Sequence, residues 1–317
     1  MNKKLKDFLY KVTSTDYKRC LAPSGNCENA PTQAHSIQNS RIFDLLQNDG
    51  HLVSFKIVPS SEIGHHLDFD ERIGRNQAST FQGLCNNHDT KIFQEIENQN
   101  LDLKNNSKQL FLFAYRAVLK EMHAVTLTAL RTQSTYKKQI ELGLIPKSEP
   151  SAFGLWATDW VSNAYLMNIY KNKYDEVYLS ESFKDIHHDL IVLQDQSPTI
   201  AVSSLFSLDH IKIQNDIARV ALSIFPKNES ETIVLFSYLK LEAPKAREEI
   251  KEIFFAGPLL KRKLISKLVL QNCENFFISP GYFESWSKSK RKLVKDYFDK
   301  TLYGQNVEID SSEILLF

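Results

Sequence analysis

The sequence predicts an α+β protein with a small N-terminal part, a long connecting helix and a C-terminal part that holds a mainly antiparallel sheet. Three observations lead to this prediction. Cysteines gather near the N-terminus, a middle stretch without proline or glycine has apolar residues at helical spacing, and strand-like runs precede helical segments in the last half. We therefore expect three consecutive parts, at residues 1–105, 106–150 and 151–317.

The N-terminal part should alternate short helices with one strand. Apolar residues at helical spacing predict three helices, at 5–12, 36–46 and 89–97. Residues 51–58 alternate between apolar and polar side chains and are stopped by Pro59, which predicts a strand. The stretch 60–80 is polar and contains glycines, which predicts a loop.

The rest of the chain predicts one long helix followed by strands and then helices. Residues 107–142 indicate one helix, or two, ending at Gly143, and Pro146 and Pro150 mark a linker. β-rich runs predict five strands, at 176–179, 189–193, 199–205, 219–225 and 232–239. The last two, joined by a short polar segment, indicate a hairpin. Helical spacing returns at 243–255, 259–271 and 282–302.

The composition is that of a globular protein, with 42% hydrophobic residues, 24% charged residues and a formal net charge of +1. Four cysteines in 317 residues do not form a disulfide framework. No apolar run has the length of a signal-peptide core or a membrane span. We therefore expect a protein of the reducing cytoplasm without a membrane partner. The ten glycines form no phosphate-binding motif, which argues against nucleotide hydrolysis and dinucleotide binding.

Four side chains have the chemistry and spacing of a structural zinc site. Cys20 and Cys27 flank a turn that contains proline and glycine, and Cys85 and His88 form a Cys-x-x-His step at the start of a predicted helix. Three sulfurs and one imidazole make a closed tetrahedral ligand set for zinc. The alternative interpretation is three buried cysteines and a solvent-facing histidine. The fourth cysteine, Cys273, stands alone and predicts a buried thiol.

The order of these motifs resembles the zinc-stabilised HNH (ββα-metal) nuclease family over residues 18–98. The matching residues are Cys20, Cys27, Ala34-His35-Ser36, the segment from Gly74 to Ser79, and the segment from Cys85 to Asp89. The resemblance implies that His35 is the general base that activates water. It also implies that Asn76 is the middle asparagine of the family and that Asp89 binds a catalytic magnesium or manganese ion.

Three features of the chain depart from that family. The family has histidine or asparagine after the zinc knuckle, where this chain has Asp89. The family has an acidic or histidine metal ligand directly before the base, where this chain has Ala34. It also has a hairpin where we expect the helix at 36–46. The magnesium site could therefore be built differently, or His35 could belong to a module without activity, bind the zinc ion itself, or have a structural role.

Basic residues gather towards the C-terminal end. Ten basic and four acidic residues lie between 256 and 300, whereas residues 1–110 contain equal numbers of both. The side chains expected to contact a nucleic-acid backbone are Lys261, Arg262, Lys263, Lys288, Lys290, Arg291 and Lys292. Tyr282, Phe283 and Trp286 lie among them and would stack on bases. The alternative is a solvated helix face whose aromatic residues belong to the core.

These observations lead to three hypotheses of function. The first is a metal-dependent endonuclease that hydrolyses phosphodiester bonds of DNA or RNA; the resemblance to bacterial modules found near phage-defence genes implies a role in anti-phage defence. The second is a non-catalytic, zinc-stabilised adaptor or sensor that binds nucleic acid or a protein partner from the same operon. The third places the activity in the C-terminal part, with the zinc part as a scaffold.

Overall fold

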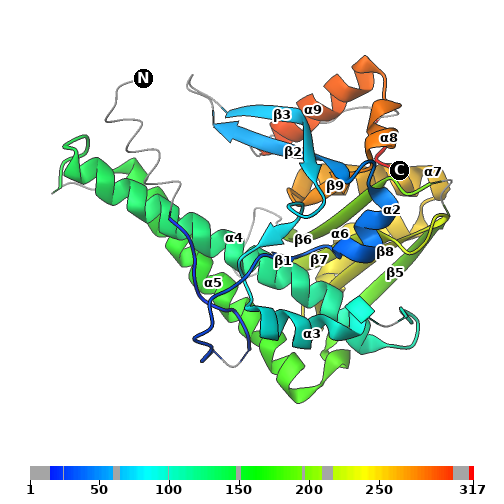
Figure 1. Cartoon of the computed structure of the whole chain (residues 1–317), viewed down its shortest axis with the longest axis horizontal. Coiled ribbons are helices and arrows are strands. Elements are labelled where there is room, and N and C mark those ends of the chain that lie inside the picture. Colours follow the sequence, from blue (N-terminus) through cyan, green and yellow to red (C-terminus); the bar gives the residue numbers. More distant parts are fainter. Residues whose placement is uncertain are drawn as a thin grey trace. The chain divides into compact units, whose positions relative to one another are not determined.

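The computed structural model describes residues 15–23, 25–59, 65–98, 100–147, 151–194, 197–208, 217–302 and 314–317. These residues form an α+β fold with eight α-helices, a seven-stranded sheet and a two-stranded sheet (Figure 1). The chain groups into two compact units. Unit 1 comprises Met1–Ala34, Phe81–Gln94 and Val118–Ser182, and unit 2 comprises His35–Thr80, Glu95–Ala117 and Phe183–Phe317. Their limits differ from the boundaries near residues 105 and 150, which stay predictions.

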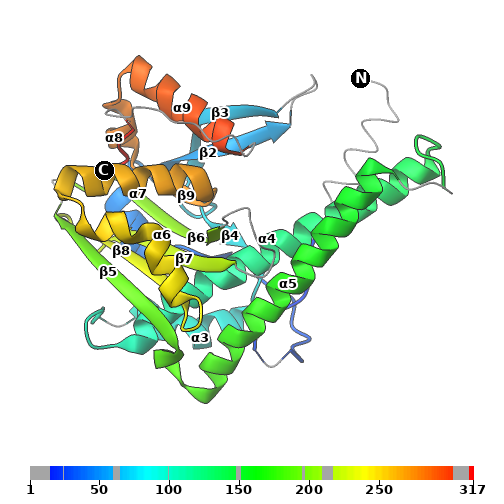
Figure 2. The ribbon, with the colours of Figure 1, turned by 180° about the vertical axis from the view of Figure 1, so that it is seen from behind.

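Two long helices make up most of unit 1. α4 (Ser107–Glu141) contributes the larger part of its length, and α5 (Ala152–Ser180) lies beside that part (Figures 1 and 2). Gly154 allows this close approach, because a side-chain carbon at that position would lie 2.9 Å from the ring of Tyr136. The hydroxyl of Ser151 starts α5 by accepting a hydrogen bond from the backbone N–H of Gly154 at 3.0 Å.

The seven-stranded sheet forms the centre of unit 2. In spatial order its strands are β3 (His65–Gly74), β2 (His51–Pro59), β9 (Phe276–Ile278), β6 (Ile200–Leu208), β7 (Ala218–Pro226), β8 (Glu231–Leu239) and β5 (Ile186–Gln194). Each described pair of strands is antiparallel. The predicted hairpin is β7–β8, in which Pro226 pairs with Thr232. Nearly every residue of β7 and β8 is buried, so both faces of the sheet are covered there.

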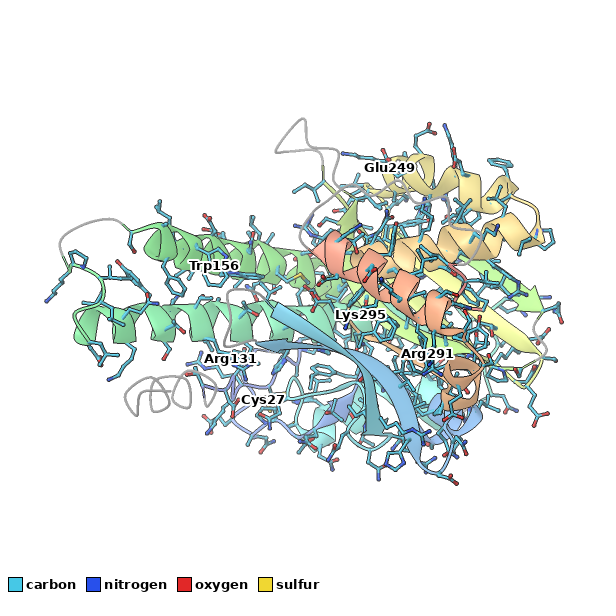
Figure 3. The ribbon with its side chains drawn as sticks, turned by 90° about the horizontal axis from the view of Figure 1, so that it is seen from above. Cys27, Arg131, Trp156, Glu249, Arg291 and Lys295 are labelled. Carbon is cyan, nitrogen blue, oxygen red and sulfur yellow. The ribbon has the colours of Figure 1, made fainter. Side chains whose placement is uncertain are left out.

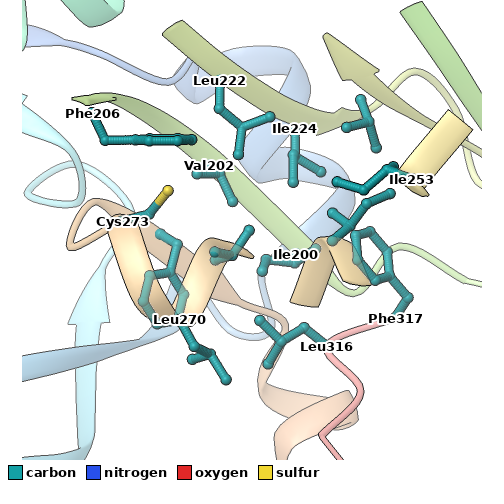
Figure 4. Packing of buried hydrophobic residues seen from close by; sticks show 14 of the residues in the cluster. Ile200, Val202, Phe206, Leu222, Ile224, Ile253, Leu270, Cys273, Leu316 and Phe317 are labelled. Atoms are coloured by element: carbon teal, nitrogen blue, oxygen red, sulfur yellow. The ribbon is translucent and has the colours of Figure 1, made fainter. Parts of the chain in front are cut away.

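One face of the sheet holds the main hydrophobic core. α6 (Ala243–Phe255) and α7 (Pro258–Asn272) pack on β6, β7 and β8 (Figure 2). Figure 4 shows side chains from these strands and helices interlocking with the C-terminal residues; they include Ile200, Val202, Leu222, Ile224, Leu270, Cys273 and Leu316. Cys273 forms no disulfide with another described cysteine and its side chain is 1% exposed, which confirms the prediction of a buried cysteine.

The opposite face of the sheet is covered by the first turns of α4. Neighbouring residues of a strand point to opposite faces, so Phe225 points away from Ile224 and the main core. The ring of Phe225 stacks on Phe113 of α4, with 4.4 Å between the ring centroids. At the β2–β3 end, α8 (Pro280–Glu284) and α9 (Lys288–Leu302) pack on β2 and β3.

Most predicted elements are confirmed. The helix expected at 89–97 is α3 (Asn86–Asn98), and the stretch 107–142 forms α4 as one continuous helix. The strands expected at 51–58, 189–193, 199–205, 219–225 and 232–239 are β2, β5, β6, β7 and β8. The helices expected at 243–255 and 259–271 are α6 and α7. The helix predicted at 5–12 lies outside the described residues.

Two predictions of element type were wrong. Residues 176–179 belong to α5 and form no strand, because Tyr170, Tyr174 and Val177 are buried on one side of that helix at helical spacing. The stretch 60–80, expected as a loop, contains strand β3, which pairs along its length with β2. The alternation of Leu67, Phe69 and Ile73 in the sequence was the signal for that strand.

Other elements differ from the prediction in length. The helix expected at 36–46 is a π-helical turn at Asn39–Phe43 followed by α2 (Asp44–Leu46). The helix expected at 282–302 is divided into α8 and α9. Ser287 separates them, because its hydroxyl accepts a hydrogen bond from the backbone N–H of Lys290 and so caps α9. Strand β9 was not predicted; it has three residues, too few for a periodic pattern.

Candidate metal centre

The two predicted ligand pairs come together in unit 1. The Sγ atoms of Cys27 and Cys85 are 3.8 Å apart, and Nδ1 of His88 lies 3.3 Å from Sγ of Cys85 and 3.5 Å from Sγ of Cys20. All four atoms lie within 4.8 Å of one another. Among the described residues this is the one group of three or more Cys, His, Asp or Glu side chains close enough to hold a metal ion.

These separations fit a tetrahedral ion. Zinc-to-ligand bonds of about 2.3 Å to sulfur and 2.0–2.1 Å to nitrogen place two sulfurs of a tetrahedron about 3.8 Å apart, and a sulfur and a nitrogen about 3.6 Å apart. The observed separations between ligand atoms are 3.8, 3.5 and 3.3 Å. Four protein ligands fill the coordination sphere of zinc, as structural sites require. The donor set therefore suits a structural zinc ion.

Local backbone contacts hold the ligand pairs in place. The N–H of Leu21 donates a hydrogen bond to the carbonyl oxygen of Gly83 at 2.7 Å, which fixes the first cysteine beside the second pair. The N–H of Cys85 donates to Sγ of Cys20 at 3.3 Å, a contact that orients a thiolate ligand. Gly25 has a φ of +66°, which lets the chain turn back between the first two cysteines.

Burial and hydrogen bonding act differently on the thiols. Burial raises the pKa of the Cys20 thiol to about 11. Burial also acts to raise the pKa of Cys85, but hydrogen bonds from the backbone of His88 and from the other two thiols outweigh it and lower that pKa. Because a metal binds the thiolate form, binding must release the Cys20 proton. We therefore expect the affinity of this cluster for a metal ion to increase with pH.

The strand that contains His35 pairs with the strand that directly precedes the Cys-x-x-His step. β1 (Ala34–His35) and β4 (Thr80–Phe81) form the two-stranded sheet. Backbone N–H groups of Thr32 and Ser36 donate to the carbonyl oxygens of Leu84 and Ser79, at 2.8 and 3.0 Å. The partner number falls as the residue number rises, so the two segments run antiparallel. The Cys-x-x-His step and α3 follow β4 directly.

His35 is half-buried in unit 2 and lies outside the metal-ligand group. Its Nε2 atom is shielded from solvent and has no hydrogen-bond partner within the described part of the chain. Burial lowers the pKa of His35, and the positive charge of Arg116 lowers it further. Backbone groups of Arg75 and Asn76 and the charge of Glu97 oppose this shift without cancelling it. The imidazole is therefore neutral at pH 7.

The other predicted catalytic residues lie in different units. Asn76 is exposed in unit 2, and its Oδ1 accepts a hydrogen bond from Nδ2 of Asn39 at 2.8 Å. Asp89 lies in the first turn of α3 in unit 1, where its backbone N–H donates to the carbonyl oxygen of Cys85 at 2.9 Å. Ala34, at the position of the family's additional metal ligand, is 3% exposed.

Sequence reasoning missed one buried charge beside His35. Arg116 is 2% exposed, and its guanidinium forms an ion pair with Glu97 at 2.6 Å. Its charge is one cause of the lowered pKa of His35. The signal for this residue was present, because Arg116 is the one charge within an apolar run of α4, from Leu110 to Leu119. A charged residue at a buried helix position usually has a specific partner.

Some of the side chains predicted to contact nucleic acid instead contact other residues of unit 2. The guanidinium of Arg262 donates to the backbone carbonyl of Gln194, and the ammonium of Lys290 lies 4.4 Å from the ring centroid of Trp286. The side chains of Phe283 and Trp286 are 4% and 5% exposed, so they cannot stack on bases. These two aromatic residues belong to the core, as the alternative interpretation held.

The remaining predicted basic side chains reach the surface. Lys288 and Lys292 are exposed, and their spacing of four residues puts them on one side of α9. Lys261 and Lys263 of α7 are half-buried. Fewer positively charged side chains are therefore exposed to a nucleic-acid backbone than the sequence indicates.

Comparison of the chain with protein-family models, with curated proteins and with solved structures finds no match. None of the helices in the described ranges combines the length and apolar character needed to cross a membrane.

Proposed function

We propose that this protein is a metal-dependent endonuclease with an HNH-like, zinc-stabilised module. One observation supports this proposal most. The chain runs from β1, which contains His35, through the paired strand β4 to the Cys-x-x-His step and helix α3. This strand–strand–helix order around a four-ligand centre is the arrangement that the resemblance implies. In this proposal the zinc ion has a structural role and takes no part in the reaction.

His35 is the proposed general base. A base must be unprotonated before it can take a proton from water, and the lowered pKa keeps this imidazole neutral at pH 7. The shielded Nε2 atom has no hydrogen-bond partner among the described residues, so it is available to a water molecule that enters with the substrate. The same lowered pKa predicts that cleavage is lost on acidification only below the ordinary histidine pKa of about 6.5.

The second ion of the proposed reaction needs hard oxygen ligands. A magnesium or manganese ion, when bound, would polarise the phosphodiester and stabilise the departing oxygen. Carboxylate and amide oxygens suit such an ion, and the resemblance assigns Asp89 and Asn76 to this role. Both assignments are tested by the variants Asp89→Asn and Asn76→Ala, which should lose cleavage but keep the structural zinc.

The test is cleavage of plasmid DNA, single-stranded DNA and RNA in magnesium or manganese, with zinc measured in the same preparations. His35→Ala should retain zinc and lose cleavage by about 100-fold or more, the usual contribution of a general base. His51→Ala is the matched control, because His51 is an exposed histidine of the same unit. Equal cleavage by His35→Ala and the parent protein would refute the role of His35.

A non-catalytic adaptor or sensor is the second candidate function. It is favoured by Ala34, which is buried and has no ligand atom at the position where the family binds its catalytic ion. This candidate predicts full zinc content, no cleavage of any of the three nucleic acids, and binding of nucleic acid or a protein partner encoded in the same operon. A role in anti-phage defence is compatible with either candidate.

The proposed nucleic-acid contact is the exposed side of α9. Lys288→Glu combined with Lys292→Glu should weaken binding of an oligonucleotide, because both side chains are exposed and reverse their charge without disturbing an observed contact. Binding by the parent protein should also weaken steeply with salt. Affinity that stays the same in the double variant would exclude this surface.

A further inference from the structure

A cavity of about 220 Å³ lies in unit 2 at the end of the sheet. Its described lining residues are Val53, Arg72, Phe283, Glu284 and Arg291. Val53 of β2 pairs with Arg72 of β3, while α8 supplies Phe283 and Glu284 and α9 supplies Arg291. Figure 3 shows Arg291 and Lys295 on α9, which packs against β3. Two arginines and one glutamate therefore line a single small cavity.

Arg291 is held in a fixed orientation. One of its terminal nitrogens donates hydrogen bonds to the carbonyl oxygens of Phe283 and Glu284, both at 3.2 Å. The guanidinium carbon also lies 4.6 Å from the centroid of the Phe283 ring. Its Nε atom is shielded from solvent and has no hydrogen-bond partner in the described part of the chain. Buried N–H donors almost always have an acceptor, and an oxygen of a bound ligand could supply one here.

Arg72 is paired with a carboxylate that can be displaced. Its guanidinium forms an ion pair with Glu284, and both side chains are 53% exposed. Ion pairs with this exposure are weak, because water and salt screen both charges. The carboxylate oxygens of Glu284 thus occupy a position that an oxygen of an incoming anion could take. Glu284 would then compete with the ligand for Arg72.

We propose that this cavity binds a phosphate group. Guanidinium groups match the oxygens of phosphate in geometry, and two of them suit an anion with more than one negative charge. The cavity is smaller than the 300–1,000 Å³ typical of sites for drug-sized ligands, so it suits a single phosphate group, free or at the end of a larger molecule. The site is separate from His35 and the zinc ligands, and its test does not depend on cleavage.

The probe is inorganic phosphate, titrated calorimetrically into the full-length, zinc-loaded protein at constant ionic strength. Arg72→Gln should weaken binding by about tenfold or more, because it removes charge-assisted hydrogen bonds. Glu284→Gln should strengthen binding by about fivefold, because it removes the competing carboxylate. Both residues are half-exposed, so these variants should fold. Lys300→Gln is the control, since Lys300 is an exposed cation of α9 outside the cavity lining.

A second titration separates the sources of the phosphate. A dinucleotide with a 5′-phosphate that binds more tightly than inorganic phosphate, and responds to the same two variants, would identify a nucleic-acid end as the ligand. If the two variants change the binding of inorganic phosphate only, the ligand is free phosphate. The proposal is overturned if neither probe binds, or if Lys300→Gln weakens binding as much as Arg72→Gln. It is also overturned if Glu284→Gln leaves the affinity unchanged.

Discussion

Removal of the metal should unfold the ligand segments of unit 1, and Cys85→Ser is the sharpest way to test this. The sulfur of Cys85 takes part in two of the short contacts of the cluster, 3.8 Å to Sγ of Cys27 and 3.3 Å to Nδ1 of His88. The side chain is 2% exposed, so a hydroxyl group placed there cannot gain water as a partner. The variant therefore loses a zinc ligand and gains nothing in return.

The size of the effect follows from the loop that the metal closes. Cys27 and Cys85 are separated by 58 positions. Cross-linking two points this far apart removes chain entropy from the unfolded state worth about 4 kcal/mol on the disulfide model. Structural zinc binds with about 10–16 kcal/mol at neutral pH, and a whole domain has a free energy of unfolding of about 5–15 kcal/mol. Loss of the ion should therefore lower the free energy of unfolding of unit 1 by at least about 4 kcal/mol.

The assay combines zinc analysis with hydrogen exchange. The parent protein should contain one zinc ion per chain, and Cys85→Ser should contain less and exchange faster over residues 15–34 and 81–94. Cys273→Ser is the matched control, because Cys273 is equally buried and lies in the core of unit 2. It should keep its zinc. Full zinc content in Cys85→Ser, or unchanged exchange after chelation of the parent protein, would refute the reasoning.

Two further predictions concern buried charge. The Nδ1 atom of His188 contacts the hydroxyl of Ser237, and burial lowers the pKa of this histidine to about 3. Below the ordinary histidine pKa of about 6.5, the unfolded chain therefore binds a proton that the folded chain does not bind. The free energy of unfolding should fall by about 2 kcal/mol between pH 7 and pH 5, and denaturant unfolding of His188→Asn should lack this part of the slope; an identical slope would contradict the assignment. Lys171 and Asp175 form a buried ion pair at 2.5 Å in α5. Asp175→Leu alone should lower the free energy of unfolding by about 3–5 kcal/mol, because it leaves a buried lysine without its partner. The double variant with Lys171→Met should recover most of this loss. Equal losses of stability in the single and the double variant would contradict this explanation.

The cluster of three cysteines and one histidine could be predicted because its signals are local. Each ligand pair occupies one short segment, Cys20 to Cys27 and Cys85 to His88, and each segment has its own turn or helix start. Soft ligands at such spacing are rare without a metal. The pairing of the two segments needed no knowledge of the fold, since the ion itself requires four ligands.

The missed elements depend on contacts between distant residues. α5 has exposed apolar residues such as Leu155 and Tyr165 as well as buried ones such as Tyr170, so its apolar positions do not form a single stripe. β9 has three residues and exists because it pairs with β2 on one side and β6 on the other. Neither signal is present in the local sequence. In contrast, β3 had an alternating pattern that the neighbouring polar residues obscured.

The order of the chain explains why the four residues of the candidate metal centre are so far apart in sequence. The chain leaves unit 1 after Ala34 and returns at Phe81, and the residues between belong to unit 2. The pairing of β1 with β4 brings the departing and returning segments together, and the cysteine ligands lie just outside that pair. A long excursion is tolerated when its ends are joined, because closure entropy grows slowly with loop length. The strand pair thus joins the two ends of the segment that supplies β2, β3 and the candidate base His35.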